Sequence, residues 1–533
     1  MIDHQRRVAI IGAGVGGLSQ AIALKTKLRF HDFTIYEKGS EVGGAWRANT
    51  YPGCSSDVQI HWYSLSSDLY PLWNKSHGLQ PEIQAYWIKL TKKYNLYPHI
   101  AFNSKVLSAE WDDAKKQYTI VVEDTFSGKR MSSMAHVVIS AVGVLEAPKI
   151  PYEIPGVRKF QGTSFHSAQW PSSIDMQNKR VAVIGNASSG AQFVPFISED
   201  PSVEVINFIR TPTWFTSRPH VPYSDTEKWI FANIPLAMRL HRAWIMFWFD
   251  FPSIVRPSDK ALKKRREAMT KYILDKAPTR YHDHMIPNYP PGCKRTVANS
   301  GFLDILHRPN LTLNFDGIAN IVENGIITKT GEMLPFDVII YATGFISDRY
   351  PMHVRGLNGA TIQGYYDAHG GPTAYLGTAV PGIPNFYLLI GPNTGIPAST
   401  LFMEEVQIGY ILQLIEPVLS GSASSFTVKA SPTDIYNAKV QERISRSVFE
   451  QCHSWARTNG TGKVYNPFPW AATLWWWWLR KPNWDHYVAF GAEKWVWARR
   501  KKVVKNILKC AAVLMLSWSY ISGSAQRIYT TWW

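Results

Sequence analysis

A short apolar run that leads directly into a glycine-rich turn constrains the fold of this chain more than any other feature. Val8–Ile11 has the composition of a buried parallel strand, and a helical pattern begins after the turn. Gly12 permits the tight turn, Gly14 lets the backbone approach a pyrophosphate, and Gly17 allows the helix to pack closely on the strand. The segment therefore predicts a dinucleotide site at a helix N-terminus. The alternative is a glycine-rich turn without function.

An acidic residue at the end of the next strand strengthens this prediction. Phe33–Tyr36 has the pattern of a second strand and is followed by Glu37, about twenty residues past the last glycine. A carboxylate at this place accepts a hydrogen bond from a ribose hydroxyl of the nucleotide.

The same pattern of strand, turn and helix occurs a second time. Val181–Ile184 leads into a turn in which Ala187 replaces the middle glycine and still permits a fairly close approach. The next strand, Val203–Ile209, ends in Arg210 and Thr211, so a cation stands where the first unit has a carboxylate. An arginine there pairs with the 2′-phosphate of NADPH, and the alternative is an arginine in a surface turn. The second turn consists of Gly185, Asn186, Ala187, Ser188, Ser189 and Gly190.

Two units that end in residues of opposite charge predict two different nucleotides. The acidic unit favours FAD and the basic unit favours NADPH, which together indicate a flavoprotein that receives hydride. The expected fold class is α/β, with two Rossmann-like dinucleotide-binding domains, the second inserted into the first. A helical insertion and a Trp-rich C-terminal extension complete this arrangement.

Composition limits the partners and the compartment only loosely. With 57 Lys and Arg against 40 Asp and Glu, the 533-residue chain has a formal charge of +17, which suits phosphate-bearing cofactors, a membrane surface or nucleic acid. The cysteines lie far apart, without the spacing of a redox pair or a zinc site. We therefore expect reduced thiols in a cytoplasmic compartment and no metal site. The cysteines are Cys54, Cys293, Cys452 and Cys510.

Two further motifs resemble those of one enzyme family. Residues 43–46 (GGAW) lead through residues 51–53 (YPG) to Asp57, in the order found in type I Baeyer-Villiger monooxygenases of the flavin-containing monooxygenase superfamily. The family fingerprint FxGxxxHxxxWP is matched by Phe160, Gly162, His166, Trp170 and Pro171. His166 is interpreted as a linker histidine rather than a catalyst, because the fingerprint lies in the connection to the second nucleotide strand. The resemblance covers roughly residues 6–460.

The resemblance implies an FAD- and NADPH-dependent enzyme that inserts one oxygen atom from O2 beside a ketone carbonyl, giving an ester or lactone through a flavin peroxide. Lys294 and Arg295 resemble the family's Lys-Arg pair, in which lysine helps to hold the NADPH 2′-phosphate and arginine is the catalytic cation. The usual proline after this pair is Thr296 here. Arg295 would keep the peroxide anionic and Asp57 would orient Arg295. Two solvated basic residues and a turn aspartate are the alternatives.

Matching the family's positions extends the expected cofactor sites. Arg295 and Asp57 form the expected catalytic pair. The expected FAD contacts are Gly12, Gly14, Gly17, Glu37, Gly44, Ala45, Trp46, Asp57, Tyr63, Val106 and Leu401. The expected NADPH contacts are Ser55, Ser56, Gly185, Asn186, Ala187, Ser188, Ser189, Gly190, Arg210, Thr211, Lys294, Arg295 and Trp455. The substrate is expected to be a small hydrophobic ketone of natural-product metabolism.

The domain boundaries follow from the two units. Residues 1–154 and 336–470 would form the FAD-binding domain, and residues 155–335 the NADPH-binding domain. Residues 225–283 within the latter have the pattern of a helical insertion.

Aromatic residues in that insertion lie on apolar stripes of the expected helices. We expect Trp229, Trp244 and Trp248 to pack in a core, and the alternative is the wall of a substrate cavity.

Residues 471–533 form a basic, Trp-rich extension outside the resemblance. They contain Trp475–Trp478, a basic cluster at Arg499–Lys505 and an apolar run at Cys510–Ile521 that is too short to span a bilayer. Indoles beside Lys and Arg suit a membrane interface. Packing against the FAD domain and a site for a partner are the alternatives. The expected location is cytoplasmic, with membrane association through this extension.

Other functions fit part of the sequence. An S- or N-oxygenase would use the same cofactors, but such enzymes usually carry another residue where Trp170 and Pro171 stand. A flavin-dependent disulfide reductase would need paired cysteines. A non-enzymatic adaptor on a membrane or nucleic acid would explain the charge but leave both nucleotide sites without a purpose, so no nucleic-acid partner is expected.

Overall fold

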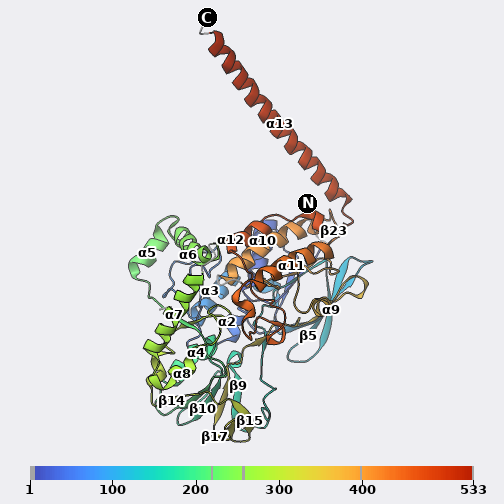
Figure 1. The fold of residues 1–533 in the computed structure, drawn as a ribbon. Coiled ribbons are helices and arrows are strands. Elements are labelled where there is room, and N and C mark those ends of the chain that lie inside the picture. Colours follow the sequence, from blue (N-terminus) through green and yellow to red (C-terminus); the bar gives the residue numbers. More distant parts are fainter. Residues whose placement is uncertain (1–5, 218–219, 255–258, 396–398, 531–533) are drawn as a thin grey trace.

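Two five-stranded parallel sheets organise the part of the chain that the computed structural model describes, which is residues 6–217, 220–254, 259–395 and 399–530 (Figure 1). The first sheet runs β21 (Phe386–Leu388), β7 (Val137–Ser140), β1 (Val8–Ile11), β2 (Phe33–Tyr36) and β3 (Ile100–Ala101). All four residues of β1 are buried, as expected for the central strand of a sheet that is covered on both faces.

Alternate residues of β1 face two different layers, because side chains of a strand point in turn to opposite faces. Val8 and Ile10 pack among residues of α1 (Val15–Ala23), α3 (Gln80–Lys93) and α10 (Thr400–Leu419). Ala9 and Ile11 pack instead against an antiparallel sheet. This second layer consists of β20 (His353–Arg355), β4 (Ser104–Asp112), β5 (Gln117–Asp124) and β6 (Arg130–Ala135).

The second parallel sheet repeats this arrangement. It runs β14 (Leu311–Asn314), β11 (Glu204–Phe208), β10 (Arg180–Ile184), β18 (Val338–Tyr341) and β9 (Thr163–His166). Val181 and Val183 face the helices α4 (Ser188–Ile197) and α7 (Asp259–Lys276), while Ala182 and Ile184 face a small antiparallel sheet. That sheet consists of β15 (Ile318–Val322), β16 (Gly325–Thr328) and β17 (Met333–Pro335).

The two parallel sheets are interleaved in the sequence. Every strand of the second sheet lies between β7 and β21 of the first. Because β18 belongs to the second sheet, that sheet extends a few residues beyond the predicted boundary at residue 335. Short strand pairs also form outside the parallel sheets. They are β8 (Ala147–Pro148) with β19 (Phe345–Ile346), and β12 (Phe215–Ser217) with β13 (Val297–Asn299).

The remaining helices surround these layers. They are α2 (Ala45–Ala48), α5 (Asp225–Asn233), α6 (Ala237–Ile254), α8 (His282–Met285), α9 (Ile362–Ala368), α11 (Ala430–Ser445), α12 (Ala472–Leu479) and α13 (Glu493–Thr530). Helices α5 to α7 fall within residues 225–283, the segment with a helical pattern, and α8 begins at its end.

The tryptophans of α5 and α6 are not in a core. Trp229, Trp244 and Trp248 are more than half exposed, so the expectation of core packing is wrong. The apolar stripe of α6 instead faces outward, because its opposite face is fixed to the body by Phe249, whose ring packs against the buried Trp62.

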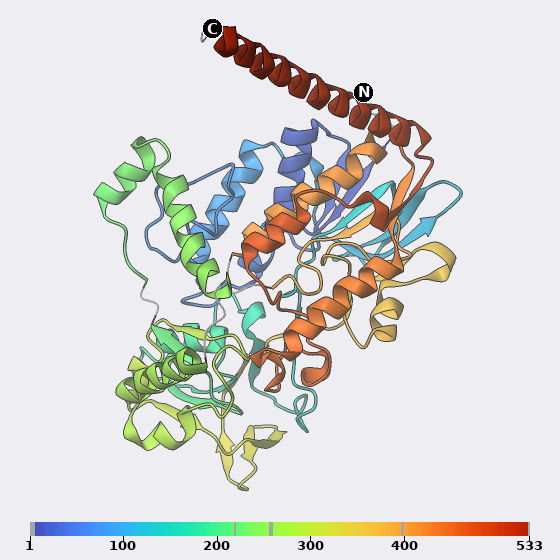
Figure 2. The ribbon, with the colours of Figure 1, turned by 45° about the horizontal axis from the view of Figure 1, so that its top comes forward.

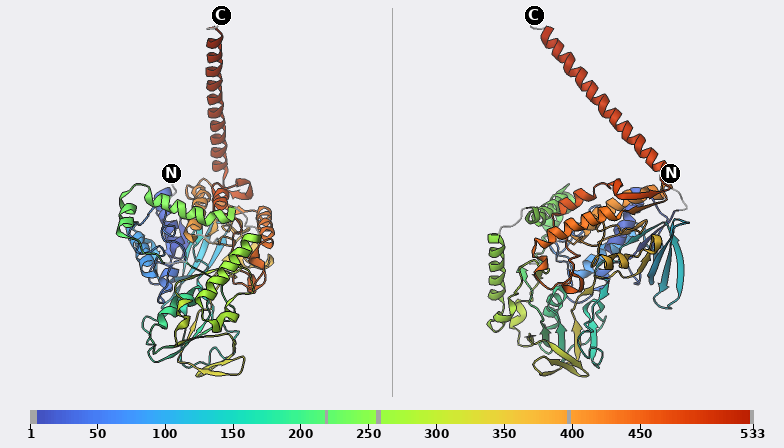
Figure 3. Two further views of the ribbon diagram at one scale, coloured as in Figure 1. Left: turned by 60° about the vertical axis from the view of Figure 1, so that its left-hand side comes forward. Right: turned by 45° about the vertical axis from the view of Figure 1, so that its right-hand side comes forward.

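The C-terminal extension divides into a packed and an unpacked part. Trp475 is fully buried, Trp484 and Trp495 pack on Phe426, and β23 (Tyr487–Phe490) pairs with β22 (Ser425–Val428). The 38-residue helix α13 then leaves the body, as the views in Figures 2 and 3 show. Among the described residues, no helix combines the length and the apolar character needed to cross a bilayer. Residues 531–533 and the side chains of residues 502–503, 506–507 and 519–530 lie outside the description.

Candidate functional site

The first glycine turn joins β1 to α1 and has no room for side chains at two positions. Gly12 has a positive φ of 101°, and a Cβ there would lie 2.7 Å from the carbonyl oxygen of Ala141. A Cβ on Gly17 would lie 1.9 Å from the carbonyl oxygen of Gly12. Gly14 faces the backbone of Gly44, so the turn and the GGAW segment meet. The backbone is thus shaped for close approach of a phosphate to the N-terminus of α1.

Glu37 directs its carboxylate at this turn. Oε2 accepts a hydrogen bond from the backbone N–H of Ala13 at 2.7 Å, and Oε1 accepts from that of Gly39 at 2.8 Å. The side chain is buried at the carboxyl end of β2. This position fits the predicted hydrogen bond to a ribose hydroxyl.

Glu404 is a second acidic residue at this turn and was not predicted from the sequence. A Cβ on Gly16 would lie 2.8 Å from its Oε1, which places the carboxyl beside the start of α1. Burial, and then repulsion by Glu405, raises the pKa of Glu404 to about 8. The group is therefore mainly protonated at neutral pH and can donate a hydrogen bond next to the expected pyrophosphate without repelling it. Its only sequence signal was a pair of adjacent acids, Glu404 and Glu405, in the first turns of the mainly apolar helix α10.

The expected catalytic residues lie beside an aromatic pair. Trp46 donates a hydrogen bond from its indole nitrogen to the hydroxyl of Tyr63 at 3.0 Å. Burial raises the pKa of Tyr63, which also lies within the electrostatic influence of Asp57 and Arg295. The structure therefore brings Arg295, from a distant part of the sequence, to three residues of the segment 46–63.

An ion pair joins the two halves of the protein, which are the layers around the first parallel sheet and the layers around the second. Nη2 of Arg295, from the loop before β13, lies 2.5 Å from Oδ2 of Asp57, from the loop after the YPG segment. The Arg295 side chain is 57% exposed and that of Asp57 is 24% exposed. The guanidinium is thus held at one end by the carboxylate and remains accessible on its other side.

The second glycine turn has the same geometry as the first. Gly185 has a positive φ of 114°, and a Cβ there would lie 2.5 Å from the carbonyl oxygen of Ala342. Ala187 is the N-cap of α4, and Ser188 and Ser189 begin that helix. The backbone N–H groups of this first turn are free of intrahelical partners and suit a phosphate.

Helix α4 is also the contact between the halves. Gln192 donates hydrogen bonds from Nε2 to the carbonyl and hydroxyl oxygens of Ser55, at 3.1 and 3.2 Å. Its Oε1 accepts a hydrogen bond from the Tyr51 hydroxyl at 3.0 Å. Ser55 and Ser56 are both buried, and Ser55 lies against the second turn's helix.

Three basic side chains converge beyond β11. Burial, and then repulsion by Arg210, lowers the pKa of Lys294, whose Nζ lies 4.8 Å from the centre of the Tyr289 ring. Burial, followed by Arg210 and Lys294, lowers the pKa of His453. Mutual repulsion of these groups would be relieved by a doubly charged anion such as a 2′-phosphate. His453 was not predicted, although it stands two residues before the expected contact Trp455.

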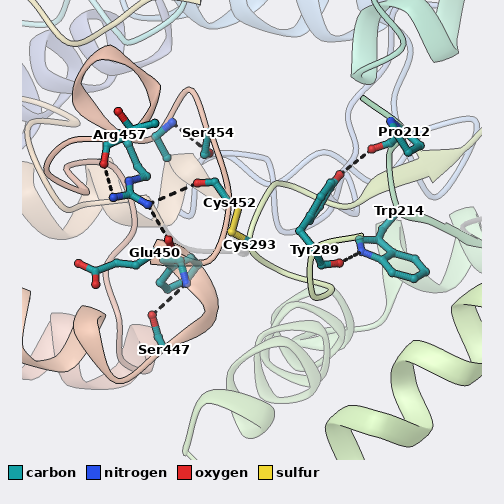
Figure 4. The surroundings of a disulfide bond; sticks show 12 residues. Pro212, Trp214, Tyr289, Cys293, Ser447, Glu450, Cys452, Ser454 and Arg457 are labelled. Carbon is teal, nitrogen blue, oxygen red and sulfur yellow. Dashed lines mark hydrogen bonds between the residues drawn. A yellow bond between two sulfur atoms is a disulfide. The ribbon is translucent and has the colours of Figure 1, made fainter. Parts of the chain in front are cut away.

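A disulfide connects the loops that carry these residues, which corrects the expectation of four reduced thiols. Cys293 and Cys452 are bonded across 159 residues of sequence, with their Cα atoms 6.2 Å apart (Figure 4). Cys54 and Cys510 are free thiols. The expectation failed because it was based on sequence spacing, whereas disulfide formation depends on the distance in the folded chain. The bond ties Lys294 and Arg295 to the segment of Trp455.

Both loops beside the disulfide are held by further contacts (Figure 4). Arg457 donates a hydrogen bond from Nη1 to the carbonyl oxygen of Glu450 at 2.6 Å. On the other side, Trp214 donates a hydrogen bond from its indole nitrogen to the carbonyl oxygen of Tyr289 at 2.9 Å. Tyr289 in turn donates from its hydroxyl to the carbonyl oxygen of Pro212 at 2.8 Å. These contacts hold the two loops that the disulfide joins, one of which continues into Arg295.

The remaining expected residues lie at different depths. Val106 is buried in β4 and Leu401 is buried in the first turn of α10, while Thr211 is half-buried and Trp455 is 43% exposed. Trp170 of the fingerprint contacts the rings of Phe165, Phe193 and Tyr51 between the two halves. His166 is buried and accepts a hydrogen bond from the backbone N–H of Ala168. The fingerprint thus joins structural elements, as its position in the sequence suggested.

Two nucleotide-type turns on two parallel sheets, with a cation held between them, define a two-nucleotide oxidoreductase of the flavoprotein monooxygenase class. A family model described as flavin-binding monooxygenase-like matches residues 5–223. A Baeyer-Villiger monooxygenase of Pseudomonas aeruginosa is 35% identical over 462 residues, covering 84% of this chain and 85% of that protein. The FAD-binding monooxygenase ktnD of Aspergillus niger is 30% identical over 553 residues, covering 99% of this chain and 89% of that protein.

Solved structures show the same fold. The closed crystal structure of cyclohexanone monooxygenase has a TM-score of 0.80 at 22% identity, covering 91% of this chain and 99% of that chain. The chain belongs to the Baeyer-Villiger monooxygenases, and its cofactors are FAD and NADPH.

Replacing Arg295 by alanine tests its role as the catalytic cation. Arg295→Ala should still bind FAD and oxidise NADPH, but ester formation from a ketone should fall by about 100-fold or more, since a fixed charge that stabilises a developing anion is worth this much. Product formation and NADPH consumption would be measured together. The control is Arg265→Ala, an exposed arginine on α7. Ester formation at the wild-type rate in Arg295→Ala would remove that residue from the chemistry.

Removing the disulfide should loosen the NADPH side of the site. Cys293→Ser with Cys452→Ser should lower the free energy of unfolding by about 2–5 kcal/mol, as is typical for a bond that closes a long loop. It should also raise the KM for NADPH, because Lys294 is adjacent to Cys293. Cys510→Ser, at an exposed free thiol, is the matched control. Thermal unfolding and KM values equal to those of the wild type would show that the bond has neither effect.

Proposed function

We propose that Arg295, held by Asp57, is the cation that directs oxygen insertion beside the carbonyl of a hydrophobic ketone. The single observation that carries this proposal is the ion pair of these two side chains beside Trp46 and Tyr63. FAD supplies the reduction of O2 when it is bound. The chain's own residues bind the cofactors and place one positive charge.

The first half of the site holds FAD. The turn from Gly12 to Gly17 receives the pyrophosphate, Glu37 accepts from the ribose, and the Trp46–Tyr63 pair lines the space between this turn and Arg295. Protonated Glu404 adds a donor at the start of α1. Val106 and Leu401 would contribute apolar contacts.

Arg295 acts by charge and not by proton transfer. An arginine stays protonated at physiological pH, so its field does not change during turnover. At about 4 Å and an effective dielectric constant near 20, the attraction for an oxygen that gains a full negative charge is about 4 kcal/mol before desolvation is subtracted. The carbonyl oxygen of the ketone gains such charge when it is attacked. Asp57 keeps the guanidinium oriented toward that oxygen.

The second half of the site holds NADPH. The turn from Gly185 to Gly190 receives the pyrophosphate, and Arg210, Lys294 and His453 surround the 2′-phosphate. The disulfide keeps this cluster next to Arg295. Trp455 would cover the nicotinamide and the substrate. Residues 155–335, with β18, would thus form the NADPH-binding domain, inserted between the two parts of the FAD-binding domain.

The reaction type is tested by comparing two substrates. Purified protein with FAD, NADPH and labelled O2 would be given a cyclic ketone and an alkyl aryl sulfide, and the products would be analysed by mass spectrometry. The proposal predicts a lactone that carries one labelled oxygen atom. Sulfoxide formation with no lactone from any of a panel of ketones would assign the site to heteroatom oxygenation.

The preference for NADPH should depend on Arg210. Arg210→Ala should raise the KM for NADPH about tenfold or more, which corresponds to the loss of a charge-assisted hydrogen bond, and leave the KM for NADH nearly unchanged. Steady-state kinetics with both nucleotides would measure the two values, with Arg265→Ala as the control. Equal changes for NADPH and NADH would contradict a contact with the 2′-phosphate.

A further inference from the structure

Exposed indoles are concentrated in three segments of the described chain. Of its exposed tryptophans, only Trp455 lies outside α5–α6, α12 and α13. The others are Trp229, Trp244, Trp248, Trp476, Trp477, Trp497 and Trp518. Indole is a large apolar group with one polar atom, and its clustering on a surface is a property of interaction sites.

Helix α6 presents a continuous aromatic face to the outside. Trp244, Phe247, Trp248 and Phe251 follow the spacing of one helix face, and each is more than 40% exposed. Their rings are in contact with one another, with centroids 5.4–6.4 Å apart. The opposite face of α6 carries the buried Ile245. A helix of a water-facing surface normally has the reverse arrangement, so the outer face of α6 is built for an apolar surrounding.

Asp250 fixes this aromatic face to α12. Its carboxylate accepts hydrogen bonds from the backbone N–H groups of Ala472, at 2.5 Å, and Thr473, at 3.0 Å, at the start of α12. Trp476 and Trp477 of α12 point outward, and the guanidinium of Arg480 lies 3.8 Å from the centre of the Trp477 ring. The two helices therefore expose their indoles from one connected unit.

Helix α13 adds an exposed basic segment and an exposed apolar segment. Arg499, Arg500, Lys501, Lys505 and Lys509 are exposed. The following residues Val513, Leu514, Met515, Leu516 and Trp518 are each more than 60% exposed. Because four consecutive residues of a helix point in all directions, this segment is apolar all round and requires an apolar surrounding on every side.

The three segments lie at the same end of the protein. Figures 1 and 3 show α5, α6, α12 and the start of α13 at this end, and the second parallel sheet at the opposite end. We infer that this end, the indole face, is a docking surface for a membrane that contains anionic lipids. Its residues are the exposed aromatic side chains of α5, α6 and α12 together with the basic and apolar segments of α13.

The charge pattern favours anionic lipid over the other occupants. Indoles prefer the boundary between headgroups and acyl chains, and Lys and Arg beside them reach lipid phosphates. A second copy of this chain would bring the same basic segment, so two copies would repel each other. Nucleic acid would leave Val513–Leu516 in water. From Cys510 to Trp518 the helix rises only about 13 Å, at 1.5 Å per residue, which suits insertion into one leaflet and not a span.

Flotation with lipid vesicles tests the inference on the full chain. The protein should float with vesicles of phosphatidylcholine and phosphatidylserine, float much less with phosphatidylcholine alone, and be released in part by added salt. Absence from both floating fractions would overturn the inference. A dimer that forms without vesicles and shows no flotation would assign the indole face to a second copy, and would overturn it too.

Two variants separate the indole face from general basic charge. Trp244→Ser with Trp248→Ser keeps the charge of the protein, and Arg499→Glu with Arg500→Glu reverses it locally. Each should reduce partition onto anionic vesicles by about tenfold or more. Phe126→Ser with Lys129→Glu, at the exposed turn between β5 and β6, should leave partition unchanged. Bound FAD, measured by absorbance, checks folding. Unchanged partition of the tryptophan variant would contradict a role for α6.

Discussion

In the mechanism we propose, one ion pair, Arg295 with Asp57, joins the two halves of this protein into a single reaction site. Asp57 follows the first glycine turn in the chain and Arg295 lies in the loop before β13, so the pair exists only when both halves are folded and in contact. The guanidinium is held by a carboxylate at one end, which fixes its direction and, because it lies on the far side, offsets only part of the attraction for an anion at the other end. The cation is thus part of the interface and not a property of either half.

Several independent contacts maintain the geometry of this pair. Gln192 joins α4 to Ser55 and Tyr51, and the rings around Trp170 fill the junction. The disulfide at Cys293 fixes the residue two positions before Arg295. Because each contact comes from a different segment, movement of one half relative to the other would change all of them together. In the proposed mechanism, this coupling would let NADPH on one side and FAD on the other act at a common point.

The sequence predicted the parts of the site that local rules govern, and missed those that depend on distance in space. Gly12 and Gly185 were predictable because a strand that turns tightly into a helix needs a positive φ there. Glu37 was predictable from its distance to the turn. The bond of Cys293 to Cys452 and the position of His453 were not, because no local pattern indicates which distant segments meet. The outward aromatic face of α6 was also missed, since an apolar stripe has the same spacing whether it faces a core or a membrane.

A double-mutant cycle on the ion pair tests its central role most directly. The kcat/KM for ester formation from a ketone would be measured for the wild type, Arg295→Lys, Asp57→Asn and the double variant. The account predicts strong coupling between the two side chains. Once one partner is changed, changing the other should lower kcat/KM little further, with an interaction free energy of about 1 kcal/mol or more. Effects that add within about 0.5 kcal/mol would show that the two side chains act independently, and would contradict the account.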